Sequence, residues 1–322
     1  MALLAGCAPV ATATPSPAPS PTTTALSSPT ALKAATATAT GVAIRSTDGL
    51  GNTIVLTSPA QRIVSLAPSN TELLYAVGAG AQVVARDDFS DYPSEAKSLP
   101  AIGGSNNVYN LEAITALKPD LVLAAELNTP DQVKALTNLG LTVYYLANPK
   151  DFEGLYQNVN TVGLLTGHQS EAQALATGLR ARVAAVSAAV QNAPDRPKVF
   201  YELDGSDPAK PWTAGKGSFV DLLITAAGGQ NVGQALATSY GQLSQEELLL
   251  QNPQIILLGD SAYGVTPDQV RARTGWAKLA AVSTGQILPF DDNLASRPGP
   301  RLVDGLEAMA RLFHPQLFTP TP

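Results

Sequence analysis

NLEAITALKPDLVLAAE, residues 110–126, and SQEELLLQNPQIILLGD, residues 244–260, are two copies of the pattern that decides the fold. They align without a gap, so that Glu112 matches Glu246 and both copies have proline at the same place. Each copy begins with an Asn or Ser that can cap a helix. A stretch with apolar residues at helical spacing follows, and a proline after it prevents the helix from continuing. An apolar run of strand length follows. The sequence therefore predicts one helix–turn–strand unit, made twice.

The two matched glutamates fall at the second position of the predicted helices if Asn110 and Ser244 are the caps. A carboxylate in the first turn is stabilised by the helix dipole and usually points into water. This local explanation is sufficient for Glu112 and Glu246 taken singly. Their occurrence at the same place in both copies is the reason to consider a shared role.

Composition bounds the class of protein. The chain has 322 residues, enough for two domains, and is 45% hydrophobic and 14% charged, as expected of a folded protein with a sizeable core. Its net charge of −6 argues against a nucleic-acid partner, which calls for a basic face. With one cysteine and two histidines, His168 and His314, the chain cannot assemble a His/Cys metal cluster of the usual kind, and we expect no intrinsic cofactor.

The N-terminus predicts an anchor and a tether. Residues 1–7 end in LAGC, which resembles a bacterial lipobox in which Cys7 is lipidated. Residues 8–40 are almost all Ala, Thr, Pro and Ser, and Lys33 is their one charged residue. Such a segment cannot bury enough apolar surface to fold. We therefore expect an extracytoplasmic protein that a lipid holds to the cell membrane. The apolar core of the signal is short, which leaves open a start upstream of Met1.

The remaining chain predicts two α/β lobes with mostly parallel sheets, each Rossmann-like, joined by a single long rigid helix. Residues 41–165 open with a hairpin signal at Asp48-Gly49 and then alternate strands with helices. Residues 194–316 resume that alternation, and 317–322 form a tail. Residues 166–193 form the interlobe helix. Steps of three and four separate the members of its apolar stripe: Leu175, Leu179, Val183, Val186 and Val190.

Four stretches carry a resemblance to a known family. They read RIVSLAPSNTELLYAVGAGAQVVARDDFSDYP, IGG followed by YNLEAITALKPDLVLA, PWTAGKGSFVDLLITAAGGQNV, and LSQEELLLQNPQIILL. In this order and spacing they resemble the type III periplasmic solute-binding proteins, over residues 42–314. Members of that family serve ABC importers of vitamin B12, haem and ferric siderophores. The resemblance implies a monomer that delivers a small-molecule metal chelate to a permease dimer with its ATPase subunits.

The same resemblance implies a role for the repeated glutamates. In the B12-binding members, each lobe presents one glutamate to arginines of the transporter's membrane subunits. Those positions match Glu112 and Glu246 here. Charge complementarity of this kind sets the register of two partners and raises their rate of encounter.

The resemblance also implies residues of a ligand site between the lobes. Phe89, Trp212 and Tyr240 keep an aromatic at loop positions that hold aromatics in B12-binding relatives, and Arg297 matches a cleft arginine. Asn106 stands where those relatives have a tryptophan. We expect a corrinoid or another bulky metal chelate, with a ferric siderophore or haem as the alternative.

Haem is the less favoured of these ligands. Haem-binding relatives carry a tyrosine that binds the iron just after the Ile-Gly pair, and Gly104 occupies that place. Tyr109 lies nearby but out of register.

The sequence also bears on two other classes of protein, a hydrolase and a sensor. A secreted hydrolase would need an activated nucleophile, but GDSAYG around Ser261 is not a G-x-S-x-G elbow, and neither histidine has a serine partner in the sequence. We therefore expect no enzyme activity. A membrane-tethered sensor would keep the same fold and cleft, and the sequence leaves it open.

Overall fold

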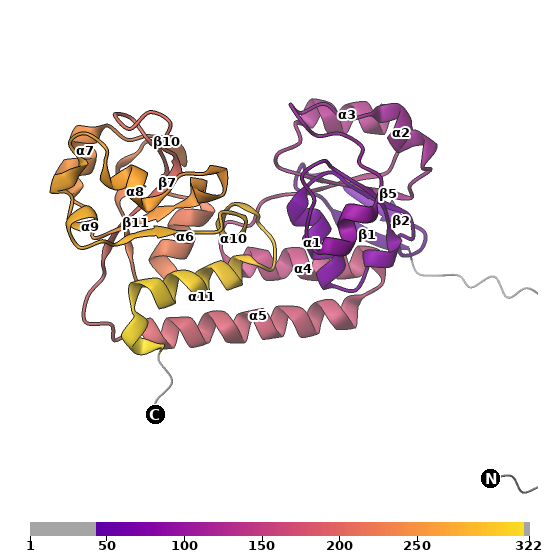
Figure 1. The fold of residues 1–322 in the computed structure, drawn as a ribbon. Helices are drawn as coiled ribbons and strands as arrows, with labels where there is room; N and C mark the ends of the chain where they lie inside the picture. Colours follow the sequence, from indigo (N-terminus) through magenta and orange to yellow (C-terminus); the bar gives the residue numbers. More distant parts are fainter. Residues whose placement is uncertain (1–42, 319–322) are drawn as a thin grey trace, which may run out of the picture. The chain divides into compact units, whose positions relative to one another are not determined.

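The repeated unit folds twice as predicted (Figure 1). The first copy forms α2 (Leu111–Ala116) and β5 (Leu121–Ala125). The second copy forms α7 (Gln245–Gln251) and β11 (Ile255–Leu258). In each case the proline between helix and strand ends the helix, because its ring removes a backbone donor and its predecessor is pushed out of helical geometry.

The computed structural model describes residues 43–318, within a compact unit that spans Gly41–Pro322. Cys7 and the 8–40 segment, to which the sequence assigns an anchor and a tether, lie outside the described residues. From residue 43 to residue 318, no helix combines the length and apolar character that crossing a membrane requires.

The first lobe surrounds a four-stranded parallel sheet. Its further elements are β1 (Ile44–Thr47), β2 (Thr53–Leu56), β3 (Ile63–Ser65), α1 (Pro68–Ala76), β4 (Val83–Arg86), α3 (Pro130–Asn138) and β6 (Val143–Leu146), with 3-10 turns at Gly80–Gln82 and Ser94–Ser98. The strand order is β4-β3-β5-β6, so β4 and β6 are the two edges. Strands β1 and β2 pair as an antiparallel hairpin, and Asp48 accepts hydrogen bonds from the backbone of Leu50 and Asn52 in its turn. The predicted hairpin and parallel sheet are confirmed.

The second lobe surrounds a six-stranded sheet in the order β10-β8-β7-β11-β12, with β9 also paired to β7. Its further elements are β7 (Lys198–Asp204), β8 (Trp212–Ala214), α6 (Phe219–Ala226), β9 (Gln230–Asn231), β10 (Tyr240–Gln242), α8 (Pro267–Arg271), α9 (Ala280–Ser283), β12 (Ile287–Pro289), α10 (Asn293–Ser296) and α11 (Leu302–Phe313), with 3-10 turns at Val232–Ala235, Gly259–Tyr263, Trp276–Lys278 and Pro315–Leu317. Strands β7, β9, β11 and β12 are parallel, whereas β8 and β10 are antiparallel to their neighbours. The mostly parallel sheet is confirmed. The loop positions predicted for Trp212 and Tyr240 are wrong, because both residues begin strands too short to show a period.

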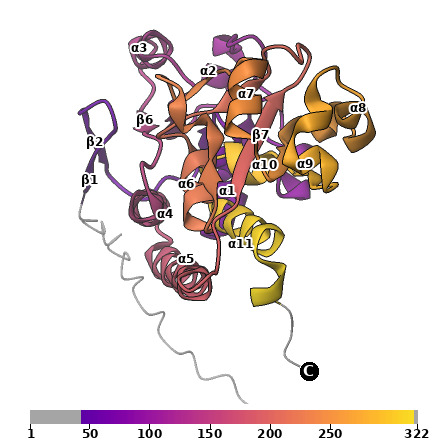
Figure 2. The ribbon, with the colours of Figure 1, turned by 90° about the vertical axis from the view of Figure 1, so that its left-hand side faces the viewer.

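One long helix connects the lobes, and the helix before it packs against α1 and β1 of the first lobe. Helix α4 (Phe152–Thr166) ends at Gly167, whose φ of 81° is the left-handed geometry that glycine adopts most readily. Helix α5 (Gln169–Val190) then packs against both α4 and α11, and Figure 2 shows α5 and α11 side by side. The predicted apolar stripe of α5 belongs to the core on this side. Arg182 of α5 pairs with Asp304 and Glu307 of α11, so the contact has a polar border.

Buried apolar side chains cover both faces of each sheet. The largest cluster runs without interruption from the first lobe through α4 and α5 to α6 and α11. A second cluster, around Phe200, Leu258 and Trp276, fills the other face of the second sheet. A third cluster, around Val64 and Val122, fills the other face of the first sheet. The two lobes therefore share one core in addition to their own.

Two helical glycines give opposite predictions for the stability of this shared core. A Cβ added at Gly163 of α4 would overlap the Cβ of Ala172 on α5, whereas one added at Gly178 of α5 would meet nothing within 4 Å. We expect Gly163→Ala to lower the free energy of unfolding by about 1–3 kcal/mol, because it overpacks the α4–α5 contact. Gly178→Ala should raise it by up to about 1 kcal/mol, because alanine restricts the unfolded chain and favours the helix.

Chemical denaturation of both variants and the wild type, followed by circular dichroism, measures these changes. Equal shifts in the same direction would show that the α4–α5 approach imposes no steric constraint.

Candidate functional site

A cavity of about 520 Å³ lies between the two lobes, at the edge of each sheet. Its first wall is Glu126, which follows β5, together with residues 147–150, which follow edge strand β6. Its second wall is the start of α6 and the start of edge strand β10, where Tyr240 stands. The carboxyl ends of strands in open α/β sheets are the usual place for a ligand. This cavity is therefore the first part of the candidate site.

A second cavity of about 420 Å³ adjoins it and shares Lys150, Gly217 and Ser218 with it. Lys150 of the first lobe and Lys216 of the second lobe both line this space. Neither ammonium group forms a hydrogen bond or an ion pair with another described residue. The β6/β10 side of the lobe boundary is thus hollow and free of direct ion pairs at these two cations.

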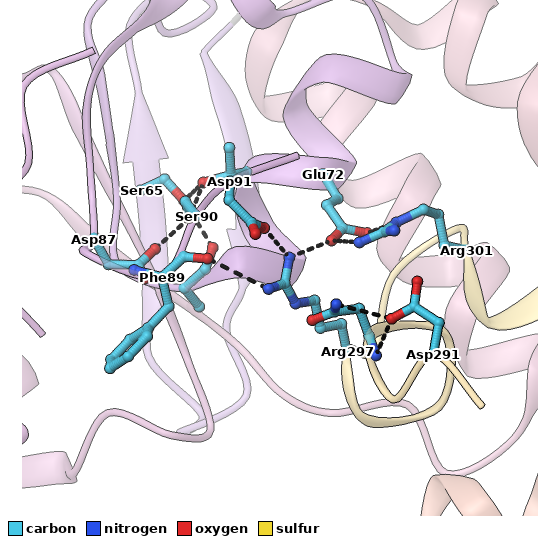
Figure 3. A network of polar contacts seen from close by, with 12 residues as sticks. Ser65, Glu72, Asp87, Phe89, Ser90, Asp91, Asp291, Arg297 and Arg301 are labelled. Carbon is cyan, nitrogen blue, oxygen red and sulfur yellow. Dashed lines mark hydrogen bonds and ion pairs between the residues drawn. The ribbon is translucent and has the colours of Figure 1, made fainter. Parts of the chain in front are cut away.

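A cluster of charged side chains joins the lobes on the other side, where β4 and β12 are the edge strands (Figure 3). We call Glu72, Asp91, Arg297 and Arg301 the Glu72 cluster. Arg301 donates two hydrogen bonds to the Glu72 carboxylate, at 2.9 and 2.5 Å. Arg297 donates to Glu72 Oε1 at 3.1 Å and to Asp91 Oδ1 at 2.7 Å. Helix α1 of the first lobe is thereby linked to the segment between α10 and α11 of the second.

The burial of Glu72 explains why two arginines meet it. Its side chain is 1% exposed, whereas the side chains of Arg297 and Arg301 are each 14% exposed. A carboxylate taken out of water is costly unless opposite charges and hydrogen bonds replace its hydration. The ring of Tyr92 also lies against Arg301, with the guanidinium carbon 4.0 Å from the ring centroid, and holds it from the other side.

The loop that carries Phe89 is fixed by a separate polar network. Asp87 is buried and accepts hydrogen bonds from the backbone N–H of Phe89, at 2.8 Å, and from the Ser90 hydroxyl. Ser90 in turn shares a hydrogen bond of 2.7 Å with Thr71 of α1. Burial raises the pKa of Asp87, and the hydrogen bonds it accepts oppose that rise without cancelling it. The Phe89 ring is left 56% exposed and points away from the Glu72 cluster (Figure 3).

The predicted ligand residues occupy different places. Tyr240 lines the 520 Å³ cavity and is 44% exposed. Trp212 is also 44% exposed and stands opposite Gln242 in the β8–β10 pairing, two positions along from Tyr240. Arg297 is part of the Glu72 cluster and also donates to the backbone carbonyl of Phe89 at 3.4 Å. Asn106 is exposed in a left-handed turn with a φ of 55° and is not among the residues that line the two cavities.

Glu112 and Glu246 are equivalent in structure as well as in sequence. Each is the second residue of its helix, α2 or α7, and each is exposed. The helices begin at the predicted caps, because Asn110 and Ser244 accept hydrogen bonds from backbone N–H groups three residues on, at 2.9 and 3.2 Å. Neither glutamate side chain bonds to another described residue. Each lobe therefore presents an unpaired carboxylate to solvent at the start of the repeated helix.

The two positions relevant to haem are both occupied in ways that oppose iron binding. Gly104 has a φ of 116°, and an added Cβ would crowd the Tyr109 ring at 3.2 Å. The Tyr109 hydroxyl donates to the Leu66 carbonyl at 3.0 Å and accepts from Asn128 at 2.7 Å. Burial, followed by the charges of nearby aspartates, raises the pKa of Tyr109 to about 12, against the effect of the Asn128 hydrogen bond. A phenolate ligand is therefore disfavoured here.

Sequence reasoning missed Glu72, Asp91 and Arg301. One local signal was available for Glu72, because it precedes Leu73 and Leu74 in a helix whose other residues are almost all apolar or small, and a buried acid requires a partner. No local signal connects it to its partners, since Glu72 and Arg301 are 229 positions apart.

Comparison with known proteins agrees with this architecture. The sequence profile of the family described as periplasmic binding protein matches residues 63–294. A cobalamin-binding protein of Halobacterium salinarum is 32% identical over 284 residues, covering 84% of this chain and 74% of that one. The uncharacterized ABC transporter substrate-binding lipoprotein YvrC of Bacillus subtilis is 30% identical over 276 residues, covering 84% and 85%.

A solved structure gives the same result for the fold. The crystal structure of the periplasmic vitamin B12 binding protein BtuF of Vibrio cholerae superposes with a TM-score of 0.69 at 28% identity, covering 81% of this chain and 99% of that one. The predicted two-lobed α/β architecture is confirmed by this likeness. The chain belongs to the periplasmic binding protein family.

Proposed function

We propose that this protein is the substrate-binding component of an ABC importer, and that it captures a corrinoid or another bulky metal chelate between its lobes. The observation that carries the proposal is the 520 Å³ cavity at the lobe boundary, bordered by Tyr240 and by the carboxyl ends of β5 and β6. The cobalamin and B12 specificity in the names of the relatives supports a corrinoid as the first candidate. Native mass spectrometry of the purified protein with cyanocobalamin, haem and ferric siderophores tests the ligand class.

Aromatic faces and one cation make up the proposed grip on the ligand. Planar chelates need apolar and aromatic walls with a few polar anchors. Tyr240 at the cavity, the exposed rings of Trp212 and Phe89, and the guanidinium of Arg297 supply groups of both kinds. Asn106 would contribute an amide in place of an aromatic face. Because Arg297 is already bonded to Glu72, the ligand would meet an arginine whose direction is preset.

Glu112 and Glu246 would dock the loaded protein on the permease. Each carboxylate has an exposed leucine near it. Leu139 is 49% exposed and shares a surface hollow with Glu112, and Leu250 is 77% exposed and lies one helical turn after Glu246. A free carboxylate beside an apolar side chain suits a socket that has an arginine and an apolar rim. The equivalence of the two lobes suits a permease dimer with two related sockets.

An extracytoplasmic location with a lipid at Cys7 would keep the protein beside its transporter. The LAGC sequence and the tether-like composition of residues 8–40 support this part of the proposal, as does the lipoprotein YvrC among the relatives. A tether of about 30 residues lets the lobes reach a partner in the same membrane without diffusing away.

The aromatic contacts give the first prediction on function. Loss of a central aromatic anchor costs about 2 kcal/mol or more, roughly thirtyfold in affinity. We expect Tyr240→Ala and Trp212→Ala each to weaken corrinoid binding to that extent in isothermal calorimetry. Tyr263→Ala is the matched control, because Tyr263 is 88% exposed on the same lobe and lines neither inter-lobe cavity.

Unchanged affinity in both variants would remove these two rings from the site. Tight binding of a sugar or an amino acid, without binding of any chelate, would show that the ligand class is wrong.

The repeated glutamates give the second prediction on function. The Glu112→Gln and Glu246→Gln variants should fold and bind ligand normally, but each should bind the transporter in nanodiscs more weakly than the wild type. Wild-type association should also weaken with added salt, because charge steering is screened.

Asp131→Asn is the matched control. Asp131 is an exposed carboxylate at the second position of α3, so it shares the helix-dipole role without the proposed docking role. If the control and both glutamate variants bind the transporter equally well at low and high salt, the glutamates serve only their helices.

The proposed lipid anchor gives the third prediction on function. Cys7→Ala, expressed behind a complete signal sequence, should move from the membrane fraction to the released fraction, because the thiol that carries the lipid is gone. Lys33→Ala changes the same N-terminal region without removing the thiol and should stay with the membrane. Membrane retention of Cys7→Ala at the wild-type level would show that the lipid is not what anchors the protein.

A further inference from the structure

We propose that Asp91 is an internal stand-in for an anionic group of the ligand: it occupies the exchangeable face of Arg297 until a phosphate or carboxylate of the chelate replaces it. This inference rests on the proposed function, because it assigns a chemical class to one part of the ligand. Its basis is the unequal way in which Glu72 and Asp91 hold the same guanidinium (Figure 3).

Glu72 is the permanent partner in the cluster. Its side chain is buried in α1, and both of its oxygens accept hydrogen bonds from Arg301. Breaking a buried ion pair by removing one partner is strongly destabilising, because it leaves an uncompensated charge out of water. The bond from Arg297 to Glu72 therefore persists whatever happens on the other side of the arginine.

Asp91 is the exchangeable partner. Its side chain is 50% exposed, and only one hydrogen bond, to Arg297, holds it. Burial alone would raise the pKa of Asp91, but the hydrogen bond and charge of Arg297 outweigh it and lower that pKa, so the group is a carboxylate at neutral pH. Exposed pairs of this kind contribute little, and a ligand anion can displace one at small cost.

The two arginines differ in the carboxylates near them, and Arg297 relies on Asp91 for part of its charge neutralisation. Arg301 has the bidentate contact with Glu72 and also the field of Asp291, which acts on it as a second carboxylate. Asp291 itself is held by Asn293. Arg297 has a single bond to the shared Glu72, a long bond of 3.4 Å to the neutral Phe89 carbonyl, and its bond to Asp91, so Asp91 is the one carboxylate that it does not share with Arg301. When Asp91 leaves, an anion is the group that restores the balance at Arg297.

The surrounding loop allows this exchange without unfolding. Phe89 and Ser90 are held by Asp87 and Thr71, none of which depends on Asp91. Asp91 can therefore swing away while the Phe89 ring stays in place. For the same reason Asp91→Asn removes the competing charge and leaves the loop folded, which makes it a clean test.

The test compares two corrinoids that share the corrin ring. Cyanocobalamin carries a phosphodiester in its nucleotide loop, and dicyanocobinamide lacks it. By calorimetry, Asp91→Asn in the full chain should bind cyanocobalamin about two- to fivefold more tightly than the wild type does, the gain expected from removing an exposed competing ion pair. Its affinity for dicyanocobinamide should be unchanged. Glu95→Gln is the control, because it removes one charge from the same lobe without touching Arg297.

Weaker or unchanged binding of cyanocobalamin by Asp91→Asn, or an equal gain for both corrinoids, would overturn the proposal. If the wild type binds neither corrinoid, the proposed ligand class fails, and a second measurement still decides the role of Asp91. Inorganic phosphate should raise the Tm of Asp91→Asn more than that of the wild type or of Glu95→Gln. Equal shifts in all three proteins would show that Asp91 does not guard an anion site.

Discussion

The burial of one carboxylate, Glu72, constrains how the two lobes meet. A charged side chain in α1 that is 1% exposed requires opposite charges close to it, and among the described residues of the first lobe none forms an ion pair with it. Arg297 and Arg301 come instead from the far end of the chain. Because Glu72 of α1 needs these arginines, the segment between α10 and α11 lies against the first lobe. The same contact sets the separation of the two lobes on this side of their boundary.

The two sides of the lobe boundary have opposite characters as a result. On the β4/β12 side, guanidinium groups and carboxylates bridge the lobes through direct hydrogen bonds. On the β6/β10 side, the walls separate into cavities, and the ammonium groups of Lys150 and Lys216 there have no hydrogen-bond or ion-pair partner among the described residues. An elongated chelate that lies between the lobes would meet the cavity walls at one end and the hydrogen-bonded Glu72 cluster at the other. If Arg297 contacts the ligand as proposed, its bond to Glu72 would fix the direction from which it does so.

The sequence predicted those features of the fold that depend on a few consecutive residues. The caps Asn110 and Ser244, the hairpin at Asp48 and the stop at Gly167 each depend on a few consecutive residues, and all were readable. Strands β8 and β10 were not, since three residues cannot display a period of two and their pairing is with each other and with β7. The resemblance to a family predicts Arg297 as a cleft arginine. Its partners Glu72 and Asp91 lie 225 and 206 positions away, and no pattern along the chain brings such residues together.

The core that the lobes share has a consequence for how such proteins can be recombined. Helices α4, α5 and α11 contribute to one apolar cluster, although the first two follow the first lobe and the last closes the second. A cut placed within α5 would divide the apolar cluster to which Val162 of α4, Leu179 of α5 and Met309 of α11 belong. A chimera that exchanges one lobe with a relative must therefore carry a matched set of these three helices, and the natural unit of exchange is larger than the lobe that the strands and loops define.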